Sequence, residues 1–208
     1  MKILISASVA TGLVAMIVGV SVGTLDHSAS KATAQEAPAD AQVPARNALG
    51  VFRSGSLAAK AGEAKKIQGA LAAARGIPDT VEDGDVHLAR EDSTYAIHVA
   101  LGHKSLCLAV RQAGGTGSLN CGGLPSSTAT TEARRPIFAV DGIGHDQYRV
   151  SGIVLDGVTD VSVVAKGSDK PVVGDVVNNV FSIVTTGDPV SLHLRLPDGS
   201  DAELPILG

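Results

Sequence analysis

Two cysteines are the residues whose type and spacing most directly suggest chemistry. Cys107 and Cys121 are the only cysteines among the 208 residues. In an oxidising compartment a lone pair of this kind predicts one disulfide, which for a loop of about 15 residues stabilises a fold by about 3 kcal/mol. A catalytic thiol and free or metal-bound cysteines remain as alternatives. Against them, the spacing contains no Cys-x-x-Cys, and two thiols do not complete a zinc site.

The histidines are the second group of residues with chemical potential. The sequence holds six of them, and His98 and His193 occupy strand-like positions that could share one face. A metal site would need a third histidine or carboxylates to converge on this pair. Without such a third ligand, His98 and His193 are expected to be exposed histidines that are unrelated to each other. His98 is expected on the outward face of its strand with Ala96 and Ala100, and His193 is expected outward on a late strand.

No established catalytic motif is present, so the sequence identifies no catalytic residue and no cofactor. It lacks G-x-S-x-G, H-E-x-x-H and a P-loop. Residues 28–31 have the Ser-x-x-Lys spacing of an acylation pair, but their position near the amino terminus favours a chance match. Aspartates in turns lack the spacing of a calcium loop and more commonly bind backbone amides. A hydrolytic site assembled only in the folded chain remains open.

Composition limits the range of partners. The net charge is −4 and the basic residues are scattered, so no basic stripe predicts nucleic-acid binding. Aromatic residues make up 2% of the chain and tryptophan is absent, which disfavours a stacked carbohydrate platform. The core is therefore expected to consist of Val, Leu, Ile and Ala.

The amino terminus has the layout of an export signal. Lys2 precedes an uncharged stretch from Ile3 to Leu25, and Ala32-Thr33-Ala34 supplies an A-x-A pattern. Two outcomes remain open, which are cleavage after about Ala34 and retention of residues 3–25 as a membrane anchor. Lys2 favours an extracytoplasmic domain in both cases. Residues 35–55, rich in Ala, Pro and Gln, are predicted to form a solvated linker.

One amphipathic helix is predicted next, from Ser56 to Gly76. Apolar residues recur at steps of three and four between these ends, Ser56 can cap the start, and Gly76 can end the helix. An acidic loop is expected to follow up to Asp85, so that residues 56–85 form a helix and a loop. The helix is expected to pack on a sheet, with partner or membrane contact as the alternative.

Residues 86–208 are predicted to form a β domain. Thr94–Leu101 and Ser105–Arg111 alternate in polarity around a short turn and predict a hairpin. A glycine-rich loop is expected at 113–118, and a short helix within 119–133. Further strands are predicted at 136–140, 148–155, 158–165, 172–177, 180–184, 190–196 and 202–207, separated by turns such as Asp141-Gly142 and Asn178-Asn179. This spacing predicts a mainly β fold, an antiparallel sandwich or a small barrel.

Three segments carry a resemblance to a known group. They are Leu106-Cys107-Leu108 with the later Cys121, Asp156-Gly157-Val158 leading into a strand, and Asn179-Val180-Phe181 after a turn. Together they resemble exported actinobacterial proteins of unassigned function, over roughly residues 86–207. The resemblance implies an extracytoplasmic β domain with one disulfide, and it implies no reaction or ligand.

These observations favour an exported, non-catalytic binding or envelope-associated module. A secreted hydrolase with an unrecognised site is the first alternative. The second is an extracytoplasmic subunit of a membrane complex, in which the helix at 56–75 contacts a protein partner.

Overall fold

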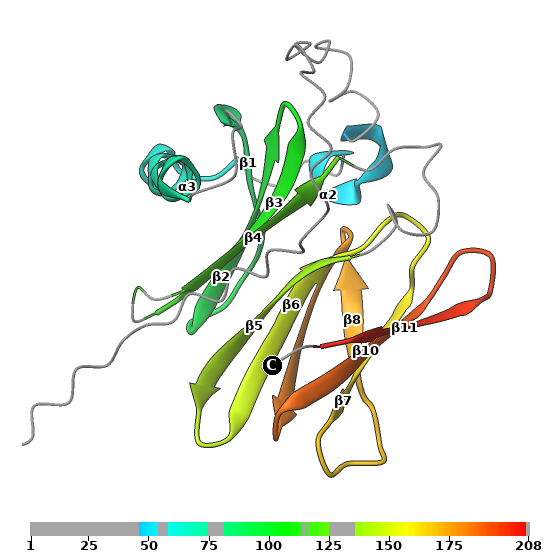
Figure 1. Cartoon of the computed structure of the whole chain (residues 1–208). Coiled ribbons are helices and arrows are strands. Elements are labelled where there is room, and N and C mark those ends of the chain that lie inside the picture. The colour runs from blue at the N-terminus through cyan, green and yellow to red at the C-terminus, as the bar shows by residue number, and fades with distance from the viewer. Residues whose placement is uncertain are drawn as a thin grey trace, which may run out of the picture. The chain divides into compact units, whose positions relative to one another are not determined.

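The hairpin predicted from alternating polarity is the centre of a four-stranded antiparallel sheet (Figure 1). The computed structural model describes residues 46–53, 58–74, 81–113, 115, 117–124 and 136–206. The predicted export or anchor segment and most of the linker lie outside these residues. The sheet has the strand order β1-β2-β3-β4, with bounds β1 Val81–Glu91, β2 Tyr95–Gly102, β3 Ser105–Gln112 and β4 Gly117–Gly123.

The last part of the predicted acidic loop, residues 81–85, belongs instead to strand β1, and residues 75–80 lie outside the described residues. Val81 pairs with Gly102 and Val86 with Ala100, and an irregularity in the register lies between the two pairs. β1 is an edge strand of the sheet, where charged residues are tolerated and discourage further strand pairing. Hydrogen bonding to β2 therefore keeps residues 81–85 extended, although their acidic composition is typical of a loop.

Strand β4 was missed by the sequence analysis. Its seven residues overlap the predicted glycine-rich loop and the start of the short helix expected within 119–133. The helix is wrong for Leu119–Gly123, which pair with β3, and residues 125–133 lie outside the described residues. The reason is long-range, since β3 supplies the hydrogen-bonding partner that stabilises an extended conformation in this glycine-containing segment.

The second sheet contains seven antiparallel strands in the order β11-β10-β7-β8-β9-β6-β5. Their bounds are β5 Ile137–Gly144, β6 Gln147–Ile153, β7 Asp160–Ala165, β8 Val172–Val177, β9 Val180–Thr186, β10 Pro189–Arg195 and β11 Asp201–Pro205. The tight turn at Asn178-Asn179 is confirmed, with φ values of 51° and 68°. Asp141-Gly142 is instead part of β5, and His145-Asp146 forms the turn with φ values of 47° and 60°.

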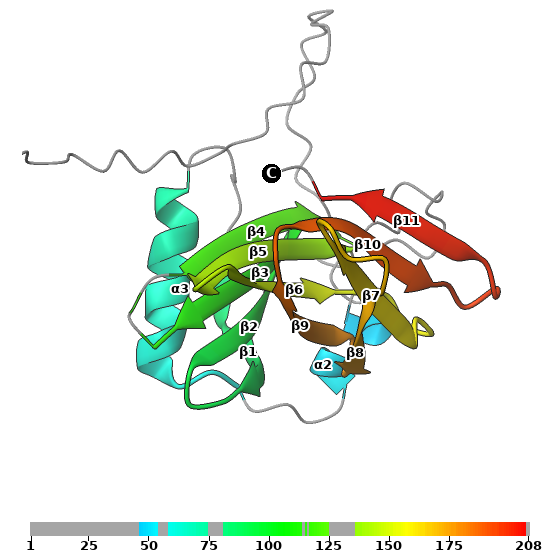
Figure 2. The ribbon, with the colours of Figure 1, turned by 90° about the horizontal axis from the view of Figure 1, so that it is seen from below.

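Three groups of buried side chains hold these layers together. The first lies between the two sheets and includes Ile97, Leu108 and Ile153. The second fills the concave side of the seven-stranded sheet, which curls into a half-barrel around Phe181 and Leu192 (Figure 2). The third lies between the four-stranded sheet and helix α3, Ala61–Ala73. The predicted mainly β fold and aliphatic core are thus confirmed.

Two segments before the sheets depart from the prediction. Leu49 and Val51 are fully buried in the core between the sheets, so the carboxyl end of the expected linker is packed and not solvated. Val51 belongs to the short helix α2, Gly50–Arg53. Helix α3 begins at Ala61, later than predicted, because Ala58 pairs with His87 as an isolated bridge. Ser56 and Gly76 lie outside the described residues. None of the helices in the described ranges is long and apolar enough to cross a membrane.

Candidate functional site

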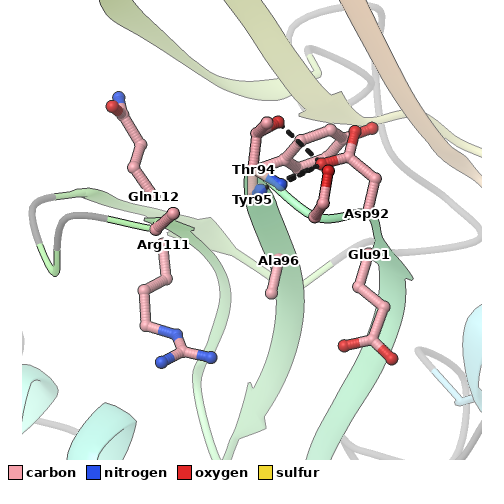
Figure 3. A pocket seen from close by; sticks show the side chains of 9 residues that line it. Glu91, Asp92, Thr94, Tyr95, Ala96, Arg111 and Gln112 are labelled. Carbon is pink, nitrogen blue, oxygen red and sulfur yellow. Dashed lines mark hydrogen bonds between the residues drawn. The ribbon is translucent and has the colours of Figure 1, made fainter.

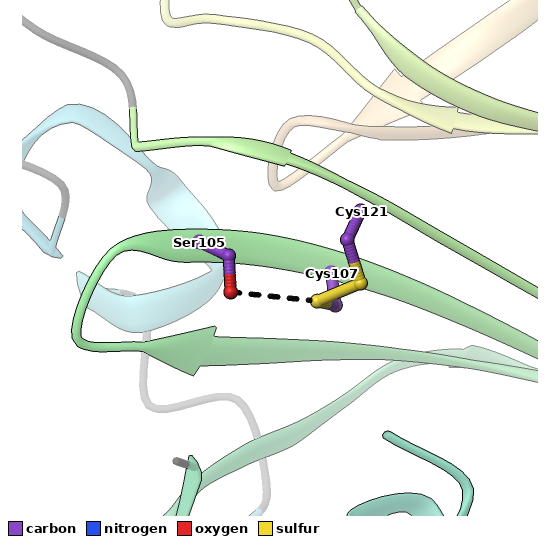
Figure 4. The surroundings of a disulfide bond; sticks show 3 residues. All are labelled: Ser105, Cys107 and Cys121. Atoms are coloured by element: carbon purple, nitrogen blue, oxygen red, sulfur yellow. Dashed lines mark hydrogen bonds between the residues drawn. A yellow bond between two sulfur atoms is a disulfide. The ribbon is translucent and has the colours of Figure 1, made fainter. Parts of the chain in front are cut away.

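The predicted cysteine pair is joined in a disulfide between neighbouring strands (Figure 4). Cys107 of β3 and Cys121 of β4 lie directly opposite each other, with their Cα atoms 4.1 Å apart. Cys107 is completely buried beneath helix α3, beside Ala64 and Leu71. Both sulfurs are thus committed to a covalent link in the core, and neither is a thiolate nucleophile or a metal ligand in this state.

His98 is buried, which corrects the prediction that it faces outward. Every residue of β2 is buried, and His98 is only 3% exposed. Alternation along the strand places its side chain on the same face as Ala100, which packs against helix α3. The predicted alternation is present in β2, but α3 and not solvent covers the face opposite the inter-sheet core.

Charged groups from three elements surround His98. Glu63 of α3 lies 3.3 Å from Arg111 of β3 and 3.2 Å from Lys66. Burial lowers the pKa of His98, and the charges of Glu63 and Glu91 only partly oppose this effect. Burial tends to raise the pKa of Glu63, but the hydrogen bond from Lys66 and the charge of Arg111 outweigh it and leave that pKa lowered. His98 is thus held as a neutral ring.

His193 lies on the other sheet, so the structure does not bring the two candidate histidines together. It belongs to β10, whereas His98 belongs to β2 of the four-stranded sheet. Its Nε2 atom lies 2.8 Å from Ser191 Oγ and 3.6 Å from Glu203 Oε1. Among the residues that the structure describes, no group of three His, Cys, Asp or Glu side chains could hold a metal ion.

The surroundings of His193 also correct a detail of the strand prediction. Strict alternation along the predicted strand 190–196, with His193 outward, would place Val190 inward and Ser191 outward, but Val190 is exposed and Ser191 is buried. The register of β10 against β7 shifts between Pro189 and Ser191, and this irregularity reverses the alternation at the start of the strand. Leu192 and Leu194 are buried as predicted.

A small polar pocket lies at the turn between β1 and β2 (Figure 3). Its volume is about 130 Å³. Nine residues line it, namely Glu91, Asp92, Ser93, Thr94, Tyr95, Ala96, Arg111, Gln112 and Ala113. Two carboxylates and one guanidinium therefore stand around one depression, an arrangement suited to a small polar ligand that carries charges of both signs.

Asp92 shapes this pocket through its own side chain. Its Oδ1 atom accepts hydrogen bonds from the backbone amides of Thr94 and Tyr95, at 2.6 and 3.0 Å, and from the Thr94 hydroxyl at 2.7 Å. Burial acts to raise the pKa of Asp92, but the hydrogen bonds from Thr94 and Tyr95 prevail and lower it. The turn is thereby fixed by an ionised aspartate.

Next to the pocket lies a buried polar cluster that the sequence analysis missed. The Arg149 guanidinium stacks over the Tyr95 ring, and its Nη2 atom lies 3.4 Å from Thr94 Oγ1. Arg149 is paired with Asp141 in the β5–β6 ladder, and Asp141 accepts a hydrogen bond of 3.0 Å from Ser118 of β4. Burial raises the pKa of Asp141, although Ser118 and Arg149 partly counter it. Only the folded chain brings these four strands together.

The pocket and this cluster present charged groups that can bind and orient a polar ligand. Glu91 and Arg111 can form charge-assisted hydrogen bonds with a ligand, while Asp92 and Arg149 hold the turn through their contacts with Thr94. Comparison with known proteins finds no matching family model, no similar curated protein and no similar solved structure.

Proposed function

We propose that this chain is an exported β domain that acts as a non-catalytic binding or envelope-associated module. The amino-terminal segment either is removed after about Ala34 or remains as an anchor formed by residues 3–25. The resemblance to exported actinobacterial proteins of unassigned function supports the same compartment. In this proposal the pocket at the β1–β2 turn receives the ligand.

The disulfide is the observation that carries the proposal. Cys107 and Cys121 account for every cysteine of the chain, and both are consumed in one bond. Structural disulfides form and persist in oxidising compartments and are rare in a reducing cytosol. A disulfide in the domain and an export-type sequence at the amino terminus therefore point to the same location.

The polar pocket supports binding rather than catalysis. Asp92 Oδ1 is already engaged by three donors, and Arg111 is tied to Glu63. These groups are held in place before a ligand arrives, which lowers the entropic cost of binding it. A small solute with an amino and a carboxylate group fits the signs of the lining charges.

The short contact between Ser191 and His193 favours a hydrolase as a second candidate. A serine nucleophile needs an imidazole in which one ring nitrogen accepts the serine proton. The other ring nitrogen must be held by an orienting group. Here both Ser191 and Glu203 contact the same atom, Nε2 of His193, and Ser191 is buried. This geometry does not set up a proton relay, so we rank the hydrolase below the binding module.

The membrane-complex alternative would use helix α3 as a contact surface. The apolar residues Ala64, Ile67 and Leu71 of α3 already pack against the sheet. A partner would then have to recognise the exposed polar side of the helix, including Lys65 and Lys66. Crosslinking in membranes that captures no partner at these positions would remove this alternative.

Intact mass of the protein from its native host tests export and the disulfide together. Loss of residues 1–34 would identify a free secreted domain, and a full-length mass in the membrane fraction would identify an anchored one. Alkylation of both cysteines only after reduction supports the proposal. Full-length protein in the cytosol with two freely alkylated thiols would overturn it.

Binding at the pocket can be tested by NMR titration of the purified protein with glycine, acetate and methylammonium. Glycine is expected to shift resonances of residues around the β1–β2 turn more strongly than either singly charged solute. Glu91→Gln should weaken this response, whereas Glu203→Gln, which changes an exposed carboxylate on the other sheet, should leave it intact. Equal responses in both variants would count against this pocket.

A further inference from the structure

His98 is a buried ionisable side chain that the proposed function does not use. It lies on the face of β2 that α3 covers, and its Nδ1 atom has no hydrogen-bond partner. A buried polar atom without a partner costs free energy, so its presence at this interface needs an explanation. The site accommodates a neutral imidazole. Protonation would add a second N–H donor to the ring, for which the site provides no acceptor.

The charges that face His98 come from each of the elements around it. Glu63 approaches from α3, Arg111 from β3 and Glu91 from β1. The two carboxylates favour a protonated ring and Arg111 opposes it, but burial is the largest influence and keeps the ring neutral. The Glu63 carboxylate is also engaged by Lys66 and Arg111, whose nitrogens lie 3.2 and 3.3 Å from its oxygens, so it is not free to turn toward His98.

Helix α3 is attached to the four-stranded sheet by side-chain contacts, including a 2.9 Å hydrogen bond from Gln68 Nε2 to Val81 O, and not by strand pairing. Its buried residues are Ala64, Ile67 and Leu71, and its N-cap residue Lys60 makes no side-chain capping hydrogen bond. Gly62 and Gly69 lie within the helix, and glycine at such positions lowers helix stability. Lifting α3 would break none of the β1–β4 ladders, so opening at this interface can be local.

We propose that α3 is an acid-released cover of the four-stranded sheet, with His98 as its trigger and the Cys107–Cys121 disulfide beneath it. When His98 gains a proton, the open state hydrates the imidazolium while the closed state cannot. Opening exposes the apolar face formed by Val86, Ala100 and Cys107. The device belongs to the fold itself and does not depend on export, although an exported domain would experience the external pH.

The pH window follows from the direction of the shift. The closed state binds the His98 proton less readily than the open state, in which the ring has its ordinary pKa of 6.5. Closure is therefore fully favoured above that value and weakens as the pH falls through 6.5 toward the lower pKa of the closed state. Each pH unit within this window changes the closing equilibrium by up to about tenfold.

Hydrogen exchange of the protein as isolated from its host tests this proposal. Exchange is measured at pH 7.5, 6.5 and 5.5 and divided by the intrinsic rate at each pH. The protection of α3 amides is expected to fall by at most about fivefold between pH 6.5 and 5.5, because half of the open-state rings are already protonated at pH 6.5. Protection in β7 and β10 should not fall over the same interval, because those strands belong to the seven-stranded sheet and not to the sheet that α3 covers.

Matched variants separate His98 from other titrating groups. His98→Gln should make the protection of α3 independent of pH, and His193→Gln, at the histidine of the other sheet, should retain the wild-type response. Gly62→Ala with Gly69→Ala should raise α3 protection at every pH. A pH response of α3 that persists in His98→Gln, or a wild-type α3 that shows none, would overturn the proposal.

Two measurements on the wild type keep the test decisive if His98→Gln does not fold. NMR titration of the His98 ring should show an apparent pKa below 6.5, and a pKa at or above 6.5 would overturn the trigger. Reduction of the disulfide by a phosphine should accelerate below pH 6.5 relative to a model disulfide peptide at the same pH. A constant ratio would show that the cover does not open. These readouts are independent of where the cell places the protein.

Discussion

The guanidinium carbon of Arg149 lies 3.7 Å from the centre of the Tyr95 ring, and this stack joins the two sheets. Tyr95 begins β2 in the four-stranded sheet, and Arg149 lies within β6 of the seven-stranded sheet. Both side chains are more than nine-tenths buried. A cation over an aromatic face in such surroundings contributes about 2 kcal/mol or more. The stack also supports the turn that carries the pocket, through the contact of Arg149 with Thr94.

We expect Arg149→Met to lower the free energy of unfolding by about 3 kcal/mol, because it leaves the buried Asp141 without the cation that faces it. Arg149→Lys should lose less, since it keeps the charge but not the planar stack on Tyr95. Urea unfolding measures both values. The double variant Arg149→Met with Asp141→Asn should recover part of the loss, and additive losses would show that the two residues are not coupled.

Asp141 should give the domain a distinctive pH dependence. Its pKa is raised in the folded chain, so its contribution to stability decreases as the pH rises from the ordinary value of 3.8 through the folded-state pKa. Asp141→Asn removes this slope, because the amide cannot ionise. The difference in unfolding free energy between variant and wild type is therefore expected to grow with pH above 3.8. A difference that is the same at every pH would contradict the raised pKa.

Removing the disulfide should lower the free energy of unfolding by about 3 kcal/mol, as the chain-entropy model predicts for a loop of this length. The variant Cys107→Ala with Cys121→Ala tests this by urea unfolding. Wild-type protein kept reduced by a phosphine provides the control and should unfold at a similar urea concentration. A double variant as stable as the oxidised wild type would show that the β3–β4 pairing does not depend on the link.

Gly62→Ala and Gly69→Ala are each expected to stabilise the protein by about 0.5–1 kcal/mol, because alanine favours a helix and nothing lies within 4 Å of the added Cβ atoms. Gly152→Ala is the contrasting substitution. Its Cβ would lie 2.5 Å from the Phe181 ring, so we expect a loss of stability from the displaced core. Thermal unfolding distinguishes the two effects by their sign.

The Asn178-Asn179 turn offers a matched pair of substitutions. Both residues have positive φ values, which glycine adopts readily. Asn179 Oδ1 also accepts a hydrogen bond from the backbone amide of Gly50 in α2. Asn178→Gly should therefore leave the free energy of unfolding unchanged or slightly higher, and Asn179→Gly should lower it by about 1 kcal/mol. Equal effects would mean that the contact with α2 contributes nothing.

Local patterns in the sequence were sufficient for much of the β architecture. The alternation in residues 94–111 specified the central hairpin, because a strand places successive side chains on opposite faces. Asn178-Asn179 specified a tight turn through its tolerance of positive φ. Two cysteines without further partners specified one disulfide. Each of these features depends on neighbouring residues or on residue type alone.

What the sequence by itself determined is therefore the mainly β fold, the aliphatic core and the cysteine pair, because periodicity and composition act locally. Only the tertiary structure decided which faces are covered. His98 is buried because α3 packs over its side of β2, and Arg149 meets Tyr95 because two sheets distant in sequence come together. Strand β4 likewise exists because β3 supplies its hydrogen bonds. Burial and long-range pairing are properties of the assembled layers, so no local pattern in the chain encodes them.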